Sequence, residues 1–332
     1  MDRRAVPSRR RLLADMLAGA LVAAGGTAAR AQERKRLIRI VVGFPAGGGT
    51  DIVARLLADR LRVPFASSVI VENKPGAAAR ASVDYVKNAE PDGSVLLFTP
   101  DFPITVYPHS FRSLSYDPLR DLVPVAPAAK SMLTYNVGPA VPASVTSLAG
   151  FVQWCRDNPG RANYATTAAG GTPHFVGVML ANAAGVAMTP VHYRGGAPAL
   201  QDLLGGHVPA SVNPISETLS LAKSGTLRML AVTGAQRSRF LPDVPTMREQ
   251  GFDVVVESWL GAFAPARTPP EIVQALGGAI NAVAQSPEMT ESLAKFGNEP
   301  ALQTPAAFAA TVRADIARWG PVVKASGFVA ED

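Results

Sequence analysis

The chain has 332 residues, 48% of them hydrophobic and 17% charged, and a formal net charge of +6. Residues 1–31 hold six arginines and two aspartates and so carry +4 of this charge, which leaves residues 32–332 near neutrality with 26 basic and 24 acidic side chains. A basic surface for nucleic acid is therefore not expected, and the single cysteine, Cys155, excludes an intramolecular disulfide. The remaining length is sufficient for two lobes, each with its own core.

Residues 1–31 have the composition of an export signal. Arginines at 9–11 precede an apolar run over 12–24, and Ala29-Arg30-Ala31 has the small-residue pattern of a cleavage site. The run contains Asp15 and is too short to span a bilayer as a stable anchor. We therefore expect export to the periplasm, by the Sec or the Tat route. A lipid anchor is not expected, because no cysteine follows the cleavage site.

The mature chain opens with a strand, a glycine-rich loop and a helix. Residues 38–42 are apolar and mostly β-branched, as in a strand covered on both faces, and apolar residues recur at helical spacing from Ile52 onward. Between them lies the Gly loop (residues 44–51), in which Gly49 or Thr50 is expected to cap the helix. A helix N-terminus that faces such a loop offers unpaired backbone N–H groups and a partial positive charge, which suit an anion.

Nucleotide-binding motifs do not fit the Gly loop. Thr50-Asp51 stands where a P-loop has Lys followed by Ser or Thr, and Ile52 stands where the dinucleotide fingerprint has its last glycine. Asp51, in the first helical turn, would also repel a phosphate. A carboxylate held by backbone amides fits the loop better, and the alternative is a tight turn whose glycines serve backbone geometry alone.

The next elements alternate between strand and helix, which is typical of parallel α/β sheets. A second candidate ligand loop, Thr99-Pro100-Asp101, follows the third strand. We expect strands at 69–73 and 95–98, a helix at 77–89, and surface turns with short helix over 103–121.

A second unit is expected from about residue 132, and it repeats the opening arrangement. A helix is predicted at 147–158, a strand at 164–167, a small-residue turn at 168–173, and a helix over 174–184 with Thr172 as its N-cap. The elements expected after it are a helix ending at 205–206, a short strand at 207–213, a helix from 214 to about 225, a strand at 227–233 and a short helix at 247–250.

The last part of the chain is expected to return to the first unit. Residues 254–264 form a long, mainly apolar segment, and only two helices, at about 270–285 and 305–325, are expected after it. We therefore predict two α/β lobes joined by crossing strands, which places both small-residue loops across one cleft at the carboxyl ends of the strands. Lobe 1 is predicted to comprise residues 36–134 and 258–332, and lobe 2 residues 135–257.

Eight segments, in order along nearly the whole mature chain, together carry a family resemblance: residues 44–51, 71–76, 91–93, 195–199, 227–233, 241–246, 249–251 and 259–265. No one of them is specific alone, but their combination is. The chain resembles the substrate-binding receptors of the tripartite tricarboxylate transporters, the Bug family of periplasmic solute receptors.

The resemblance implies two Rossmann-like α/β lobes of the type II periplasmic-binding-protein kind that close on a ligand without chemistry. It implies a small organic carboxylate held by backbone amides and small hydroxyls, with no cofactor and no metal, so the chain is not expected to be an enzyme. Carried over by position, the expected ligand-binding residues are Phe44, Pro45, Ala46, Gly47, Gly48, Gly49, Thr50, Asp51, Thr99, Asp101, Thr167, Ala169, Gly171, Thr172, His174, Tyr193 and Asn213.

Several positions depart from the family pattern. Residues 168–175 replace a Ser/Gly-x-Gly-Ser-x-x-His-Leu pattern, Arg194 stands where lysine is usual, and Pro209 stands where an acidic residue is common. Residues 77–79 lack the glycines that usually follow Pro-Gly. The identity of the bound acid is therefore not carried over from the family.

Some candidates also have a purely structural interpretation. Asp51 can pair with Arg55 one helical turn later instead of contacting a ligand, and His174 can be a structural hydrogen-bonding group. Arg194 can clamp a carboxylate or lie solvated in its loop. Trp259 is expected to pack within the crossing segment.

The competing class is an enzyme, for which the motifs are missing. The four histidines are scattered, and the sequence has neither an H-E-x-x-H pair nor a G-x-S-x-G nucleophile elbow. A third interpretation is a periplasmic sensor, whose liganded form engages a signalling protein. The expected partners are therefore the membrane subunits of a tripartite transporter or a sensor protein, and the chain is expected to be a monomer that binds no nucleic acid.

Overall fold

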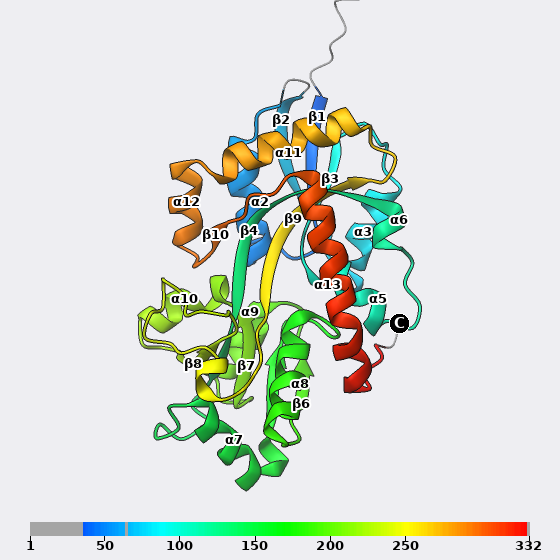
Figure 1. Ribbon diagram of the computed structural model, residues 1–332. Coiled ribbons are helices and arrows are strands. Elements are labelled where there is room, and N and C mark those ends of the chain that lie inside the picture. Colours follow the sequence, from blue (N-terminus) through cyan, green and yellow to red (C-terminus); the bar gives the residue numbers. More distant parts are fainter. Residues whose placement is uncertain (1–35, 64–65, 331–332) are drawn as a thin grey trace, which may run out of the picture.

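The computed structural model of the protein describes residues 36–63 and 66–330 (Figure 1). The predicted export signal, residues 1–31, lies outside the described residues. An upper and a lower lobe are joined by β4 (Leu122–Val137), a 16-residue strand that runs through both. Its first part pairs with β9 (Glu257–Pro265) in the upper lobe, and its last part pairs with two strands of the lower lobe.

The upper lobe is built on the strand order β2–β1–β3–β9–β4. The central strand β1 is parallel to β2 and β3, whereas β9 is antiparallel to β3 and β4, and the short β10 is antiparallel to β4. The strands are β1 (Arg36–Val42), β2 (Ala66–Asn73), β3 (Val95–Pro100) and β10 (Glu299–Pro300). The helices around them are α2 (Gly49–Arg60), α3 (Arg80–Lys87), α11 (Pro270–Ala284), α12 (Pro287–Ala294) and α13 (Pro305–Ser326).

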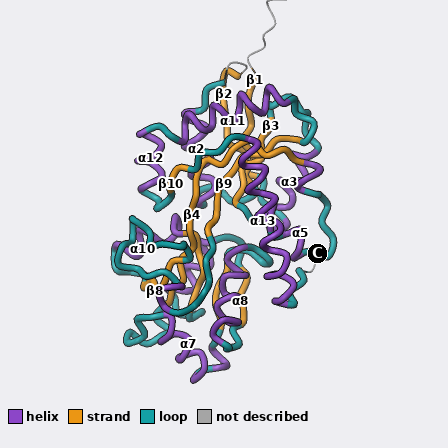
Figure 2. Tube along the Cα trace, viewed as in Figure 1, coloured by secondary structure: helices purple, strands orange, loops and turns teal. Residues whose placement is uncertain are grey.

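Helices cover both faces of this sheet (Figure 2), which explains the continuous apolar run of β1. Successive side chains of a strand point to opposite faces. Ile40 accordingly packs with Leu57 of α2 and Leu276 of α11, whereas Val41 packs with Val83 of α3 and Phe308 of α13 on the other face.

The lower lobe continues the order as β4–β7–β5–β6, and β8 also pairs with β4. Parallel pairing joins β5 to β6 and β7, and both β7 and β8 are antiparallel to β4. The strands are β5 (Asn163–Thr166), β6 (Thr189–His192), β7 (Ala210–Pro214) and β8 (Arg228–Val232). The helices are α7 (Leu148–Asp157), α8 (Thr172–Ala184), α9 (Gly196–Leu204) and α10 (Ile215–Lys223).

The α/β fold class with crossing strands is confirmed, and α13 is a further link between the lobes. Phe308 of α13 belongs to the upper core, while Trp319 packs in the lower core with Tyr135, Phe151 and Phe175. The exact lobe boundaries at 134/135 and 257/258 stay a prediction. No helix in the described part of the chain is long and apolar enough to cross a membrane.

Two expectations about local structure are wrong because apolar packing and backbone conformation decide them. Residues 103–121 contain short helix, as expected, but their first half is not a surface turn: α4 (Phe102–Thr105) and α5 (Tyr107–Ser110) bury Ile104 and Tyr107 completely, and exposed residues become frequent only over 112–121, which end in α6 (Pro118–Asp121). The predicted helix 77–89 begins only at Arg80, since Ala77, Ala78 and Ala79 form a turn, η1 (Ala77–Ala79), with φ of 45°, 53° and 73°.

Helix starts and one strand also differ from expectation. The N-caps of α2 and α8 are Gly48 and Gly171, one or two residues before the predicted caps, so Gly49 and Thr172 are already the first residues of their helices. The strand β4 was not predicted: the sequence indicated only the start of a second unit at about residue 132, whereas the strand begins at Leu122. Pro124 and Pro127 obscured it in the sequence, but each lies beside a β-bulge, where a missing N–H is tolerated. Elements not foreseen are also α12, β6, β10 and the turn η2 (Pro159–Arg161), while η3 (Arg248–Gln250) matches the predicted short helix.

Candidate ligand-binding site

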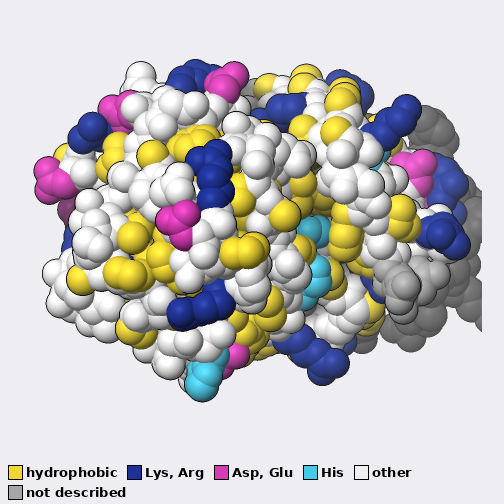
Figure 3. All heavy atoms as spheres, turned by 90° about the horizontal axis from the view of Figure 1, so that it is seen from below, with side chains coloured by type: hydrophobic (Ala, Val, Ile, Leu, Met, Phe, Trp, Pro, Cys, Tyr) yellow, Lys and Arg dark blue, Asp and Glu magenta, His cyan; other side chains and the backbone are white. Residues whose placement is uncertain are grey.

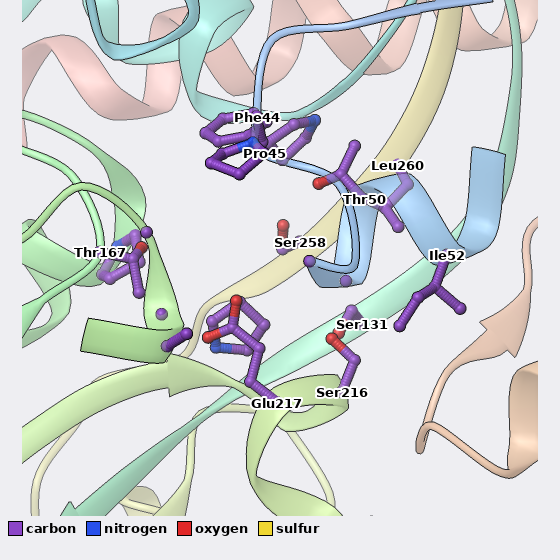
Figure 4. Close-up of a pocket in the computed structure, with 18 of the residues that line it drawn as sticks. Phe44, Pro45, Thr50, Ile52, Ser131, Thr167, Ser216, Glu217, Ser258 and Leu260 are labelled. Carbon is purple, nitrogen blue, oxygen red and sulfur yellow. The ribbon is translucent and has the colours of Figure 1, made fainter. Parts of the chain in front are cut away.

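A cavity of about 490 Å³ lies between the two lobes (Figure 4). Its walls are loops that follow the carboxyl ends of parallel strands: the Gly loop after β1, Asp101 after β3, Thr167 after β5, Arg194 after β6 and Ser216 after β7. Ligands of open α/β sheets bind at this edge. The lining is mainly apolar, with Phe44, Ile52, Leu133, Leu200 and Leu260 among its members.

Four helices of eight or more residues open onto this cavity with their N-termini. They are α2, α8, α9 and α10, whose first residues or N-caps Gly49, Thr172, Gly196 and Pro214 line it. None of the four N-caps makes a side-chain capping hydrogen bond. Because the first N–H groups of a helix have no acceptor within the helix, the cavity gathers unpaired donors and partial positive charge, which favour an anion.

A buried network fixes the Gly loop in shape. The Gly47 N–H donates to Asp51 Oδ2 at 2.9 Å and Arg55 Nε donates to the same oxygen at 2.8 Å. Asn73 Nδ2 donates to Asp51 Oδ1 at 2.8 Å and to the Phe44 carbonyl at 3.1 Å. Burial alone would raise the pKa of Asp51, but the hydrogen bonds from Arg55, Gly47 and Asn73 outweigh it and lower that pKa. Asp51 therefore does not line the cavity but stabilises the Gly loop from outside it. This agrees with the structural interpretation, in which Asp51 pairs with Arg55 and does not contact a ligand.

Asp101 links the two lobes at the cavity wall. Its Oδ1 accepts a hydrogen bond from Ser258 Oγ of β9 at 2.6 Å, and its Oδ2 accepts one from Thr172 Oγ1 of α8 at 2.8 Å. Burial raises the pKa of Asp101 to about 6, although both hydrogen bonds act to lower it. Both carboxyl oxygens are therefore used within the protein.

Glu217, in the first turn of α10, points its carboxyl group into the cavity (Figure 4). Its Oε2 accepts a hydrogen bond from Asn213 Nδ2 at 3.1 Å and lies so close to Gly196 that a side chain there would collide with it. Burial raises the pKa of Glu217 to about 7, against the hydrogen bond from Asn213, which lowers it.

The predicted site residues separate into three groups: those that line the cavity, those that lie next to it, and those that are directed elsewhere. Those that line the cavity are Phe44, Pro45, Ala46, Gly47, Gly48, Gly49, Thr50, Asp101, Thr167 and Thr172. Thr99 is buried behind the wall without a hydrogen-bond partner for its Oγ1. Gly171 is the N-cap of α8 and packs against Phe102, and Asn213 supports Glu217 from β7. Like Asp51, these residues lie next to the cavity, but their side chains have other roles.

His174, Tyr193 and Ala169 are directed elsewhere. The Gly170 N–H donates to His174 Nδ1 at 3.2 Å, and the ring packs against Phe175, His192 and Phe328. Burial, and to a lesser degree His192, lowers the pKa of His174 to about 3, so the ring is neutral at ordinary pH. Tyr193 Oη donates to Asp202 at 2.6 Å.

Ala169 and Tyr193 line a second cavity of about 930 Å³, which shares Phe44, Pro45 and Thr167 with the first. His192 and Phe328 also line it. Seen from below, histidine side chains lie among hydrophobic ones in a hollowed part of the surface, and charged groups of both signs are scattered around it (Figure 3).

The sequence did not single out several cavity residues, including Ser131, Ser216, Glu217, Ser258 and Asn298. Asn298 is fully buried, and neither its Nδ2 nor its Oδ1 has a hydrogen-bond partner. Such an unsatisfied amide on a cavity wall calls for a ligand or water contact. Only Ser216 and Glu217 had a usable signal, because they directly follow Asn213-Pro214, the predicted start of a helix.

Comparison with known proteins places the chain among transport receptors. The model of the tripartite tricarboxylate transporter family receptor matches residues 53–328. BugT of Bordetella pertussis is 33% identical over 294 residues, which cover 88% of this chain and 90% of BugT. Of the solved structures, Rpa4515 of R. palustris with adipate has a TM-score of 0.84 at 32% identity and covers 89% of this chain and 99% of its own. MatC of Rhodopseudomonas palustris with bound malate has a TM-score of 0.80 at 28% identity, with 87% and 99% covered.

Proposed function

This chain belongs to the tripartite tricarboxylate transporter family of receptors, and from that premise we propose that it is a periplasmic receptor for a small organic carboxylate. The family is one of solute receptors and not of enzymes, so the proposed event is binding and release. The convergence of four uncapped helix N-termini on one cavity carries the proposal, because this arrangement favours an anion without requiring a buried lysine or arginine.

The proposed site is the wall that the two lobes share. One ligand carboxylate accepts hydrogen bonds from the backbone N–H groups of Gly49 and Thr50, in the first turn of α2, with Thr172 approaching from α8 and the amide of Asn298 available nearby. Adipate and malate in the two related structures are acids of a size that a cavity of about 490 Å³ admits. The location in the periplasm, the monomeric state, the two-lobe boundaries and the membrane subunits of a tripartite transporter as partners belong to this proposal.

A thermal-shift screen of organic acids, with sugars as the comparison class, tests the proposal. A ligand that binds only the folded state raises Tm through linkage, so we expect at least one small carboxylate to raise it. A response to sugars together with none to any organic acid contradicts the proposal.

Gly48→Val locates the binding. A side chain at Gly48 would meet only the Pro45 carbonyl, at 3.5 Å, and φ there is −74°, so the fold accommodates a valine that occupies space on the cavity wall. We expect the variant to unfold cooperatively and to lose the carboxylate response. Gly160→Val, at an exposed position with open space around it, is the matched control and should retain the response. Unchanged affinity in Gly48→Val would show that the Gly loop is only a turn.

A further inference from the structure

Glu217 is the one carboxyl group on the wall of this cavity, within residues 36–63 and 66–330, that has an oxygen left for a ligand. Both oxygens of Asp101 accept hydrogen bonds from Ser258 and Thr172. In Glu217, Oε2 is held by Asn213, whereas Oε1 has no hydrogen-bond donor from the described protein and faces the cavity. Glu217 Oε1 is therefore a free hydrogen-bond acceptor on the wall of the cavity that α10 contributes.

The charges on the same wall oppose a second anionic group on the ligand. The lining residues with formal charge are Asp101, Glu217 and Arg194, and Arg194 is exposed in its loop. Glu217 Oε2 also lies against Gly196, at the N-terminus of α9. One of the four helix N-termini is thus already covered by an anion of the protein itself.

We propose that Glu217 makes the cavity selective for a carboxylate whose far end carries a protonated amine, in preference to a dicarboxylate of the same length. The inference rests on the proposed function, because it takes one ligand carboxylate at the Gly loop as given. An ammonium group supplies the donors that Oε1 lacks and forms a charge-assisted hydrogen bond with it. A second carboxylate at the same place would face Glu217 across a mainly apolar cavity, where like charges are weakly screened.

The burial of Glu217 supports this assignment. Burial raises the pKa of this carboxyl group to about 7 despite the hydrogen bond from Asn213, and no positively charged side chain of the described protein is among the causes that lower it. An ammonium ion in the cavity would provide that partner and favour the ionised form. The isosteric Glu217→Gln keeps an acceptor for Asn213 and removes only the charge.

The experiment measures Kd by titration calorimetry at pH 8 for matched ligands that differ only in the end group. One set is 4-aminobutanoate, butanoate and succinate, and the other is 6-aminohexanoate, hexanoate and adipate. In at least one set we expect the wild-type protein to bind the aminocarboxylate more tightly than both partners. In Glu217→Gln, the affinity ratio of aminocarboxylate to dicarboxylate should fall about tenfold or more, since one charge-assisted hydrogen bond and one repulsion are removed.

The control variant is Glu257→Gln, which removes an exposed negative charge outside the cavity and should leave the ratio unchanged. Tighter wild-type binding of the dicarboxylate in both sets, or an unchanged ratio in Glu217→Gln, overturns the inference while leaving a carboxylate receptor in place. If none of the six acids binds the wild-type protein, the inference about Glu217 is overturned, whereas the proposed function is contradicted only if the wider thermal-shift screen of organic acids fails as well.

Discussion

Removal of the Asp51 carboxylate should destabilise the fold by about 2–4 kcal/mol. Asp51 is 1% exposed and accepts three hydrogen bonds, from the Gly47 N–H, Arg55 Nε and Asn73 Nδ2. Hydrogen bonds to a charged group each contribute about 1.5–3 kcal/mol. Part of the loss in Asp51→Ala is recovered, because Gly47 and the Arg55 side chain are exposed and can bind water, so the expected total is smaller than the sum of the three.

Urea unfolding followed by circular dichroism measures this change at pH 7. The matched control is Asp59→Ala on the same helix, α2, where the side chain is exposed and the expected effect is within about 0.5 kcal/mol. The folded-state pKa of Asp51 is below its unfolded value. Its contribution is therefore present above the unfolded pKa and is lost as the pH falls through the folded one, so the difference between wild type and variant should shrink in strong acid.

The same variant should lose affinity for a carboxylate ligand, because the network holds both Gly47 and, through Asn73, Phe44 in place. An unfolding free energy within about 0.5 kcal/mol of wild type would refute the reasoning. It would mean that the shape of the Gly loop does not depend on Asp51.

Three further predictions concern single sites. Glu217→Gln should stabilise the protein above pH 7 by no more than about 3 kcal/mol and have almost no effect near pH 4. The reason is that a raised carboxyl pKa lowers the stability of the folded state only as the pH rises from the unfolded pKa through the folded one. Equal urea midpoints at pH 8 for both proteins would contradict the raised pKa. Ala78→Gly should raise stability by about 0.5–1 kcal/mol, since Ala78 has φ 53°, and a lower Tm would argue against backbone strain there. Asp101→Asn and Thr172→Val should be coupled by about 1 kcal/mol in a double-mutant cycle of unfolding free energies, whereas additive effects would show that the hydrogen bond between the lobes contributes nothing.

Periodic apolar patterns made most of the α/β elements predictable, and context explains the exceptions. The strand β1 was recognisable as a continuous apolar run of a strand covered on both faces, and the helix α2 because its apolar residues recur at helical spacing. Pro124 and Pro127 masked the first half of β4, and only the pairing with β9 shows that bulges accommodate them. The burial of α4 and α5 depends on packing between Phe102, Tyr107 and distant residues of the lower core.

The candidate site was predictable where it follows a strand in sequence and not where it depends on packing. The Gly loop, Thr167 and Thr172 each follow a predicted strand and line the cavity. Ser258 and Asn298 reach it from a crossing strand and from a turn after the unpredicted α12, so local sequence gave no signal. His174 and Tyr193 were expected near the ligand, but the side chain of His174 in α8 packs against Phe328, and that of Tyr193 donates a hydrogen bond to Asp202.

If a ligand carboxylate binds at the helix N-termini of the inter-lobe cavity, the backbone amides of those termini change their chemical environment, and NMR reports this change residue by residue. The measurement is a titration of ¹⁵N-labelled protein with the acid that raises Tm most. We expect saturable shifts centred on the N–H groups of Gly49, Thr50 and Thr172. Saturable shifts confined to residues of the second cavity, such as Ala78 and Ala169, would contradict binding at these helix N-termini.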